Sequence, residues 1–174
     1  MKCNRLLLVV SMVLVVAFCV ASASDQVVVE YSFERPDVQT VTIDGEMYDR
    51  VIMEGAPNGG NAGQPALPAQ GASILLPFGT EVKSVTIIKG DRISLGMEYY
   101  IEPCGIPIRL SAERGEIVPP VPDEAIYNTD SDFPGSEFEE IGTHIFRGYS
   151  ILNLKLMPVQ YNPVSGELCY YPDL

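Results

Sequence analysis

Hydrophobic and polar residues alternate along much of the chain after residue 25, which is the pattern of half-buried β-strands. Residues 26–33 alternate around valine and aromatic positions. Residues 38–43 and 47–53 form two further runs joined by Asp44-Gly45. An Asp-Gly pair between two such runs predicts a β-hairpin. No useful length of chain shows a 3.6-residue repeat, so the pattern indicates an all-β protein.

The middle of the chain is punctuated by glycine and proline. No regular element is expected over residues 54–71. Strands are predicted over residues 72–76, 81–89 and 92–101, with a turn at 77–80. Residues 102–140 contain six prolines among acidic residues, which predicts one long irregular connection. Connections of this length in a compact domain are typically functional or disordered.

The last part of the chain has the clearest strand pattern. Residues 145–161 alternate, with Leu152, Leu154 and Leu156 on one face. A turn at residues 162–166 and a strand at 167–171 complete a second hairpin. About eight short strands separated by Gly/Pro turns predict an all-β fold, an antiparallel, jelly-roll-like β-sandwich with one long irregular loop.

The first 23 residues differ from the rest and are typical of a secretory signal peptide. Lys2 and Arg5 precede an apolar stretch over residues 6–20, and Ala-Ser-Ala at 21–23 forms a small-residue cleavage site. The apolar stretch is shorter than the roughly 18 residues of a spanning helix. We expect residues 1–23 to be removed and residues 24–174 to be exported as one domain, periplasmic or extracellular, with no membrane segment after cleavage.

The net charge and the length of the chain exclude some classes of function. The 174 residues include 11 Lys+Arg and 23 Asp+Glu, a net charge of −12. Nucleic acid is therefore not expected as a partner, because binding a polyanion depends on clustered basic side chains. The length suits one hydrophobic core and excludes a second, large catalytic domain.

Two cysteines, Cys104 and Cys169, remain after removal of the signal peptide. In an exported protein they could form one disulfide, or they could be two unrelated small buried side chains, and the sequence leaves both alternatives open. His144 is the only imidazole. Neither a cysteine nucleophile with its base nor a zinc site is expected from so few partners.

Acidic and aromatic residues offer weaker hypotheses. Acids at 130, 132, 137, 139 and 140 could supply oxygen ligands to calcium, but no EF-hand spacing is present, so a solvated acidic loop is favoured. Tyrosines at 99, 100, 161, 170 and 171 could stack on a sugar or belong to the core. We expect no metal and no cofactor, and the patterns alone predict a secreted all-β domain that is not an enzyme.

Several motifs are more specific than these patterns. They cover residues 63–68, 74–80, 127–135, 147–149, 157–163 and 166–168. Together they resemble the N-terminal propeptide domain of gingipain-type cysteine peptidases, from about Gly63 to the end of the chain. The motif positions are Gly63, Pro65, Leu67, Pro68, Arg147, Gly148, Pro158, Tyr161, Asn162 and Pro163.

The resemblance implies a function. Such propeptides precede a caspase-like cysteine peptidase domain, assist its folding and keep it inactive until proteolysis, and their fold is an antiparallel β-sandwich. Nothing in this chain matches the catalytic His and Cys of the peptidase, and the chain stops at Leu174, before the last strand of the family pattern. We therefore expect either a truncated precursor or a free-standing propeptide-like protein that binds a peptidase domain in cis or in trans.

The resemblance also directs attention to the long loop. A loop on a rigid β-framework can lie across a protease cleft with one side chain in the specificity pocket. For an Arg-specific partner, Arg114 is the first candidate and Arg109 the second. The alternative hypothesis is a stand-alone secreted β-sandwich that acts as a binding or adhesion module, for example for carbohydrate. A hydrolase is a third hypothesis that rests only on the abundance of acids.

Overall fold

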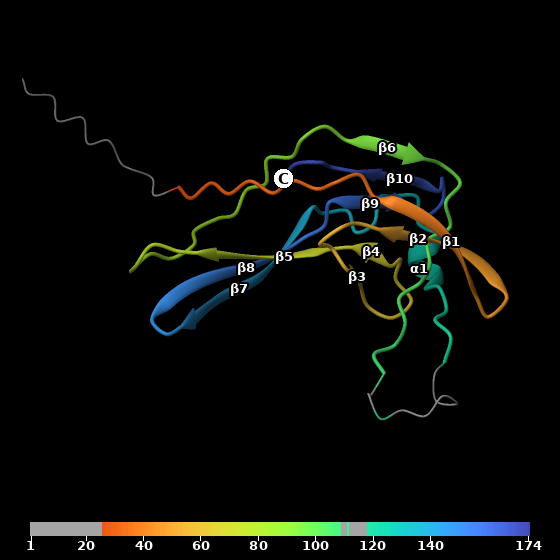
Figure 1. The fold of residues 1–174 in the computed structure, drawn as a ribbon, viewed down its shortest axis with the longest axis horizontal. Helices are drawn as coiled ribbons and strands as arrows, with labels where there is room; N and C mark the ends of the chain where they lie inside the picture. The colour runs from red at the N-terminus through yellow and green to blue at the C-terminus, as the bar shows by residue number, and fades with distance from the viewer. Residues whose placement is uncertain (1–25, 109–110, 112–117) are drawn as a thin grey trace, which may run out of the picture.

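The computed structural model describes residues 26–108, 111 and 118–174. This part of the chain forms ten strands and one short helix (Figure 1). In chain order the elements are β1 (Asp37–Ile43), β2 (Glu46–Ile52), β3 (Asn58–Gly59), β4 (Leu67–Pro68), β5 (Gln70–Leu75), β6 (Ile93–Gly96), α1 (Glu124–Tyr127), β7 (Phe138–Phe146), β8 (Tyr149–Leu156), β9 (Val159–Asn162) and β10 (Glu167–Tyr170).

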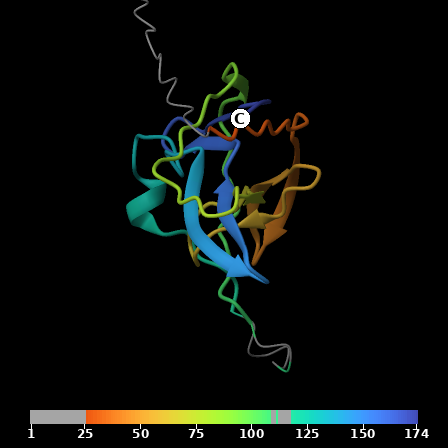
Figure 2. The same ribbon diagram turned by 90° about the vertical axis from the view of Figure 1, so that its left-hand side faces the viewer.

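Two three-stranded antiparallel sheets organise the fold. One has the order β5-β8-β7 and the other β6-β10-β9, while β1-β2 and β3-β4 form separate antiparallel pairs. The β7–β8 hairpin extends to the left of Figure 1, with β5 beside β8. Figure 2 looks toward this end and shows β1–β2 and α1 on opposite sides of it. The all-β, antiparallel, sandwich-like fold predicted from the sequence is confirmed.

One hydrophobic core joins these sheets. Leu152, Leu154 and Leu156 all point from β8 into it, as their alternation predicts. Val51 of β2 is fully buried in the same cluster, and Phe33 is also a member. The segment before residue 62, which the sequence motifs do not cover, therefore packs into the same core.

The two predicted hairpins are present. Asp44 and Gly45 both have positive φ angles, 50° and 90°, as a two-residue turn between β1 and β2 requires. Strands β9 and β10 pair with Glu167 opposite Asn162. The alternating pattern predicts no break in residues 145–161, whereas the structure turns at Arg147 and Gly148, with φ angles of 51° and 86°. These two motif residues are thus the turn between β7 and β8.

Two predicted strands are wrong. Residues 26–31 form no strand; Tyr31 instead exchanges two backbone hydrogen bonds with Leu174, both 3.0 Å long. Residues 81–89 also form no strand, although some of their apolar side chains pack on the core. The strand predicted over 92–101 is shortened to β6, because the backbone turns at Gly96 and Glu98, with φ angles of 138° and 70°.

Candidate functional site

Both ends of the long connection meet at Gly63. The Gly63 N–H donates to the carbonyl oxygen of Cys104 at 2.9 Å, and the Asp123 N–H donates to the carbonyl oxygen of Gly63 at 2.9 Å. We call residues 101–104 the outgoing stem of the loop and residues 121–137 its returning stem. One residue therefore bonds the backbones of both stems.

Only glycine suits this position. Gly63 has a φ angle of +82°, and a Cβ atom there would lie 3.1 Å from the carbonyl oxygen of Val121 and 3.3 Å from the Asp123 nitrogen. A side chain would thus add backbone strain and also push against the returning stem. The close approach gives a physical reason for glycine at this motif position.

The outgoing stem is held by an ion pair and by the segment that follows Gly63. Arg50 of β2 donates two hydrogen bonds, 2.6 and 2.7 Å long, to the carboxylate of Glu102, which is buried. These hydrogen bonds raise the pKa of Arg50. The backbone of the stem also pairs with residues 64–66, and Pro65 bridges Pro103. The stem is therefore fixed on two sides.

Helix α1 ties the returning stem to the outgoing stem. Asp123 caps the helix through its side chain, which accepts a hydrogen bond from the Ala125 N–H at 3.0 Å. At the end of the helix, the Tyr127 hydroxyl donates to the carbonyl oxygen of Ile101 at 2.8 Å. Burial raises the pKa of Tyr127, so the phenol stays a donor. The two stems are thus bonded to each other directly.

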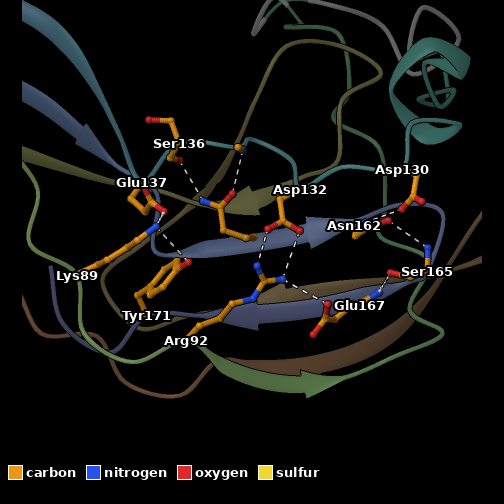
Figure 3. Close-up of polar contacts among 12 residues, drawn as sticks. Lys89, Arg92, Asp130, Asp132, Ser136, Glu137, Asn162, Ser165, Glu167 and Tyr171 are labelled. Carbon is orange, nitrogen blue, oxygen red and sulfur yellow. Dashed lines mark hydrogen bonds and ion pairs between the residues drawn. The ribbon is translucent and has the colours of Figure 1, made fainter.

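Acidic residues fix the returning stem to the β6-β10-β9 sheet (Figure 3). Arg92 donates to Asp132 at 2.6 and 3.3 Å and to Glu167 at 3.3 Å, and Lys89 pairs with Glu137. Hydrogen bonding to Asp132 raises the pKa of Arg92. Asp132 and Glu137 of the predicted acidic loop remain partly exposed, and each pairs with a basic residue from before β6.

The β9 end of the second hairpin contacts the same stem. Tyr161 and Phe133 exchange two backbone hydrogen bonds, both 2.8 Å long. The Asn162 amide donates to Asp130 at 3.0 Å (Figure 3), and its oxygen accepts from the N–H groups of Val164 and Ser165, both at 3.1 Å. Asn162 therefore fixes its own turn and the stem together.

Sequence reasoning missed one residue of this contact. Gln160 is buried, accepts from the Gly135 N–H at 2.9 Å and donates to the carbonyl oxygen of Ser136 at 3.1 Å. A glutamine in an alternating strand gives no local sign of such a role. Only its burial among backbone groups of the returning stem reveals it.

The motif residues fall into three places. The first group contacts the outgoing stem or lies in the adjacent core and consists of Gly63, Pro65, Leu67 and Pro68. The second group lies at β9, beside the returning stem, and consists of Pro158, Tyr161, Asn162 and Pro163. Arg147 and Gly148 lie elsewhere, at the β7–β8 turn. Arg147 stacks over the Phe146 ring at 5.3 Å. Arg109 and Arg114 lie outside the described residues.

Cys104 and Cys169 are both free thiols, so the disulfide that the sequence left open is not formed in the structure. Cys169 is buried in β10 opposite Gln160, whereas Cys104 is half-buried in the outgoing stem beside Gly60. The two thiols therefore lie in different parts of the fold and are not bonded to each other. Burial raises the pKa of both thiols, which makes each a poor nucleophile at neutral pH.

The tyrosines do not form a sugar-stacking face. Tyr161, Tyr170 and Tyr171 are buried in the core cluster. Tyr100 stacks on Tyr48 with ring centroids 5.1 Å apart and meets Tyr127 edge-on at 5.6 Å. These contacts favour the core interpretation of the aromatic residues over the carbohydrate-binding one.

Tyr161 leads to a prediction at high pH. Burial raises the pKa of its phenol from 10.0 to about 12. The unfolded chain releases this proton first, so the stability that the neutral phenol provides is complete below pH 10 and falls as the pH rises toward 12. Urea unfolding at increasing pH will show this fall, and Tyr161→Phe will reduce it. An unchanged pH dependence in Tyr161→Phe would contradict the assignment, and the exposed Tyr149→Phe is the control.

Comparison with known proteins identifies the family. A family model described as Propeptide_C25 matches residues 16–174. The chain belongs to the Propeptide_C25 family. This confirms the resemblance to gingipain-type propeptides and extends it to the segment before Gly63. A search of curated proteins finds no match.

Two solved structures share the fold of this Propeptide_C25 chain. The complex of the pro- and mature domains of RgpB from Porphyromonas gingivalis matches with a TM-score of 0.72 and 22% identity, covering 83% of this chain and 72% of that chain. A structure concerning the zymogenic latency of gingipain K from Porphyromonas gingivalis matches with a TM-score of 0.58 and 22% identity, covering 83% and 81%. Among the described residues, no helix is long and apolar enough to cross a membrane.

Proposed function

We propose that this chain is a propeptide domain that keeps a gingipain-type cysteine peptidase latent and assists its folding. The observation that carries the proposal is the bonding of both loop stems to one rigid β-framework. Gly63 joins the stems, Arg50 and Glu102 fix one of them, and Arg92 and Asp132 fix the other. Membership of the Propeptide_C25 family supports the same role.

Rigid stems suit an inhibitor for an energetic reason. A protein that presents a loop from fixed ends loses less conformational freedom on binding, so more of the contact energy remains as affinity. A loop presented in this way can lie across a protease cleft as an added strand with a side-chain anchor. We propose the caspase-like peptidase domain as the partner, in cis or in trans, and assign no catalytic role to this chain.

The proposal includes the export of the domain. Residues 1–23 have the composition of a signal peptide, and residues 24–174 would then be the exported propeptide domain. N-terminal sequencing of the protein recovered from the periplasm or culture medium tests this. A chain that begins at Ser24 supports it, and a chain that retains Met1 contradicts it.

The central test is inhibition. Purified residues 24–174 are mixed with an active gingipain-type peptidase from the same organism, and hydrolysis of a peptide substrate is measured. We expect activity to fall as the propeptide approaches equimolar amounts, and denatured peptidase to regain activity faster when the propeptide is present. Unchanged hydrolysis at micromolar excess of propeptide would refute the proposal.

The anchor proposal concerns Arg114. For an Arg-specific peptidase we expect Arg114→Ala to raise the inhibition constant about tenfold, because a buried arginine anchor typically contributes more than 1 kcal/mol. We expect a smaller effect for Arg109→Ala. The matched control is Arg35→Ala, which removes an exposed arginine far from the loop in sequence. Equal inhibition constants for wild type and Arg114→Ala would exclude Arg114 as the anchor.

A further inference from the structure

The β5-β8-β7 sheet continues past the hydrophobic core. On β8 the buried positions end at Leu152, although the strand and its partner β7 continue to the turn at Arg147 and Gly148. Figure 1 shows this hairpin reaching out on the side of the molecule opposite α1. The end of the sheet is therefore not needed to cover the core of this domain.

This end carries large exposed hydrophobic side chains. We call five of them the apolar tip. Their exposed fractions are 58% for Leu75, 98% for Phe78, 78% for Ile145, 62% for Phe146 and 61% for Tyr149. A hydrogen bond of 2.9 Å from the Leu76 N–H to the carbonyl oxygen of Ser150 brings the end of β5 and the start of β8 together.

The register places most of the apolar tip on one face. Phe146 and Tyr149 are cross-strand partners, so they share a face. Leu75 pairs with Ile151, which lies two residues from Tyr149 and therefore on the same face. Ile145 lies on the other face. Phe78 lies in the turn after β5, outside this register, and the three aromatic rings of the tip together expose on the order of 400 Å².

An area of this size is typical of a binding surface. The largest apolar patch on a monomeric protein is usually about 300–600 Å² and is often functional. Three of the five, Leu75, Phe146 and Tyr149, share one face at one end of one sheet, which scattered exposed residues would not do.

Strand β7 is also an open edge of this sheet in the described part of the chain. Edge strands are usually protected by charges, proline or bulges. The half near the core has Glu139, Glu140 and a register shift before Gly142. The half near the turn has none of these features. A partner could therefore add backbone hydrogen bonds at the same place as it covers the apolar tip.

Charge indicates which kind of partner covers the tip. Residues 72–80 and 141–152 contain no Asp or Glu and one arginine, Arg147, in a chain with 23 acidic residues. Two copies meeting at their tips would bring together two bodies with a strong excess of acidic residues, which opposes self-association. A different protein that offers an apolar surface with an acidic group for Arg147 avoids this repulsion.

We propose that the apolar tip docks on the peptidase domain, as a contact separate from the long loop. This inference rests on the proposed function, since it names a second surface for the same partner. The loop would block the cleft, while the tip would add binding energy without entering the cleft. The two contacts can therefore be separated by substitution.

The test measures binding of the propeptide to a peptidase whose catalytic cysteine has been replaced. We expect the double variant Phe146→Ser/Tyr149→Ser to raise Kd at least tenfold, and Arg147→Glu to raise it several-fold. The matched control is Met47→Ser, which removes a side chain that is 70% exposed on β2 and should leave Kd unchanged. Far-ultraviolet circular dichroism checks that each variant is folded. Hydrogen exchange on the wild-type complex should show protection over residues 141–149.

The outcomes separate the two proposals. If wild type does not bind, the proposed function fails. If wild type binds, but the double variant binds equally well and residues 141–149 gain no protection, the tip inference is overturned while the loop contact stands. Sedimentation velocity of the free domain tests whether a second copy of the chain covers the tip instead. If the wild type is a dimer and the double variant is a monomer, the inference is overturned in favour of a second copy.

Discussion

Replacing Gly166 with alanine will destabilise the domain by about 3 kcal/mol or more. Gly166 has a φ angle of +67°, and a Cβ atom there would lie 2.7 Å from both the Cα and the nitrogen of Glu98. Both are backbone atoms, so no side chain can rotate away to relieve the contact. Urea unfolding followed by circular dichroism measures the loss.

The control separates crowding from backbone strain. Gly79 has a similar φ angle, +74°, but no atom lies within 4 Å of a Cβ placed there. Gly79→Ala should therefore cost only about 1 kcal/mol. If both variants lose the same free energy, the close approach of Gly166 to Glu98 is not what requires glycine.

The turn that contains Gly166 also contacts the segment before the outgoing stem. The Tyr99 N–H donates to the carbonyl oxygen of Gly166 at 3.1 Å, and Tyr99 lies two residues before the outgoing stem. Movement of the β9–β10 turn in Gly166→Ala should therefore reach the loop. We expect weaker inhibition of the peptidase in this variant, beyond the loss caused by unfolded protein.

Local signals accounted for the parts of the fold that were predicted correctly. Asp44-Gly45 and the turn at 162–166 each act over a few residues, so the hairpins they close could be read directly. Arg147-Gly148 is a turn of the same kind. It was missed because arginine is an uncommon residue at a positive φ angle.

The wrong predictions have a different physical cause. Alternation shows that a segment can lie half-buried, but a strand also needs a partner with free backbone groups. Residues 81–89 alternate and some pack on the core, yet they pair with no neighbouring strand. The segment at Tyr31 meets Leu174, its partner from the far end of the chain, only at isolated bonds. Alternation contains no information about such long-range partners.

The residues of the candidate site could be predicted as motif positions, but the contacts by which they hold the loop could not. The sequence picked out Gly63 and Asn162 by family resemblance, and the structure shows that Gly63 bonds both stems of the loop while Asn162 bonds the returning stem. The pairs Arg50–Glu102 and Arg92–Asp132 join residues 52 and 40 positions apart. Charged residues so far apart give no sign of contact, so the fixing of the stems required the fold.

Replacing Tyr161 with alanine will cost about 3–5 kcal/mol of folding free energy, the range for removing a buried aromatic side chain. The side chain is fully buried, and its hydroxyl donates to the carbonyl oxygen of Tyr99 at 3.0 Å. Because the Tyr161 backbone also pairs with Phe133, the residue contacts both the approach to the outgoing stem and the returning stem. Urea unfolding measures the free energy.

Two further variants divide this effect into its parts. Tyr161→Phe keeps the ring and loses the hydrogen bond, so it should cost about 1 kcal/mol. Tyr149→Ala removes a mostly exposed ring and should change the free energy of unfolding by no more than about 0.5 kcal/mol. Hydrogen exchange at the Phe133 amide should quicken in Tyr161→Ala and stay slow in Tyr149→Ala. If the Phe133 amide is as well protected in Tyr161→Ala as in the wild type, the returning stem keeps its place without the buried ring. The ring would then stabilise the core without holding the loop.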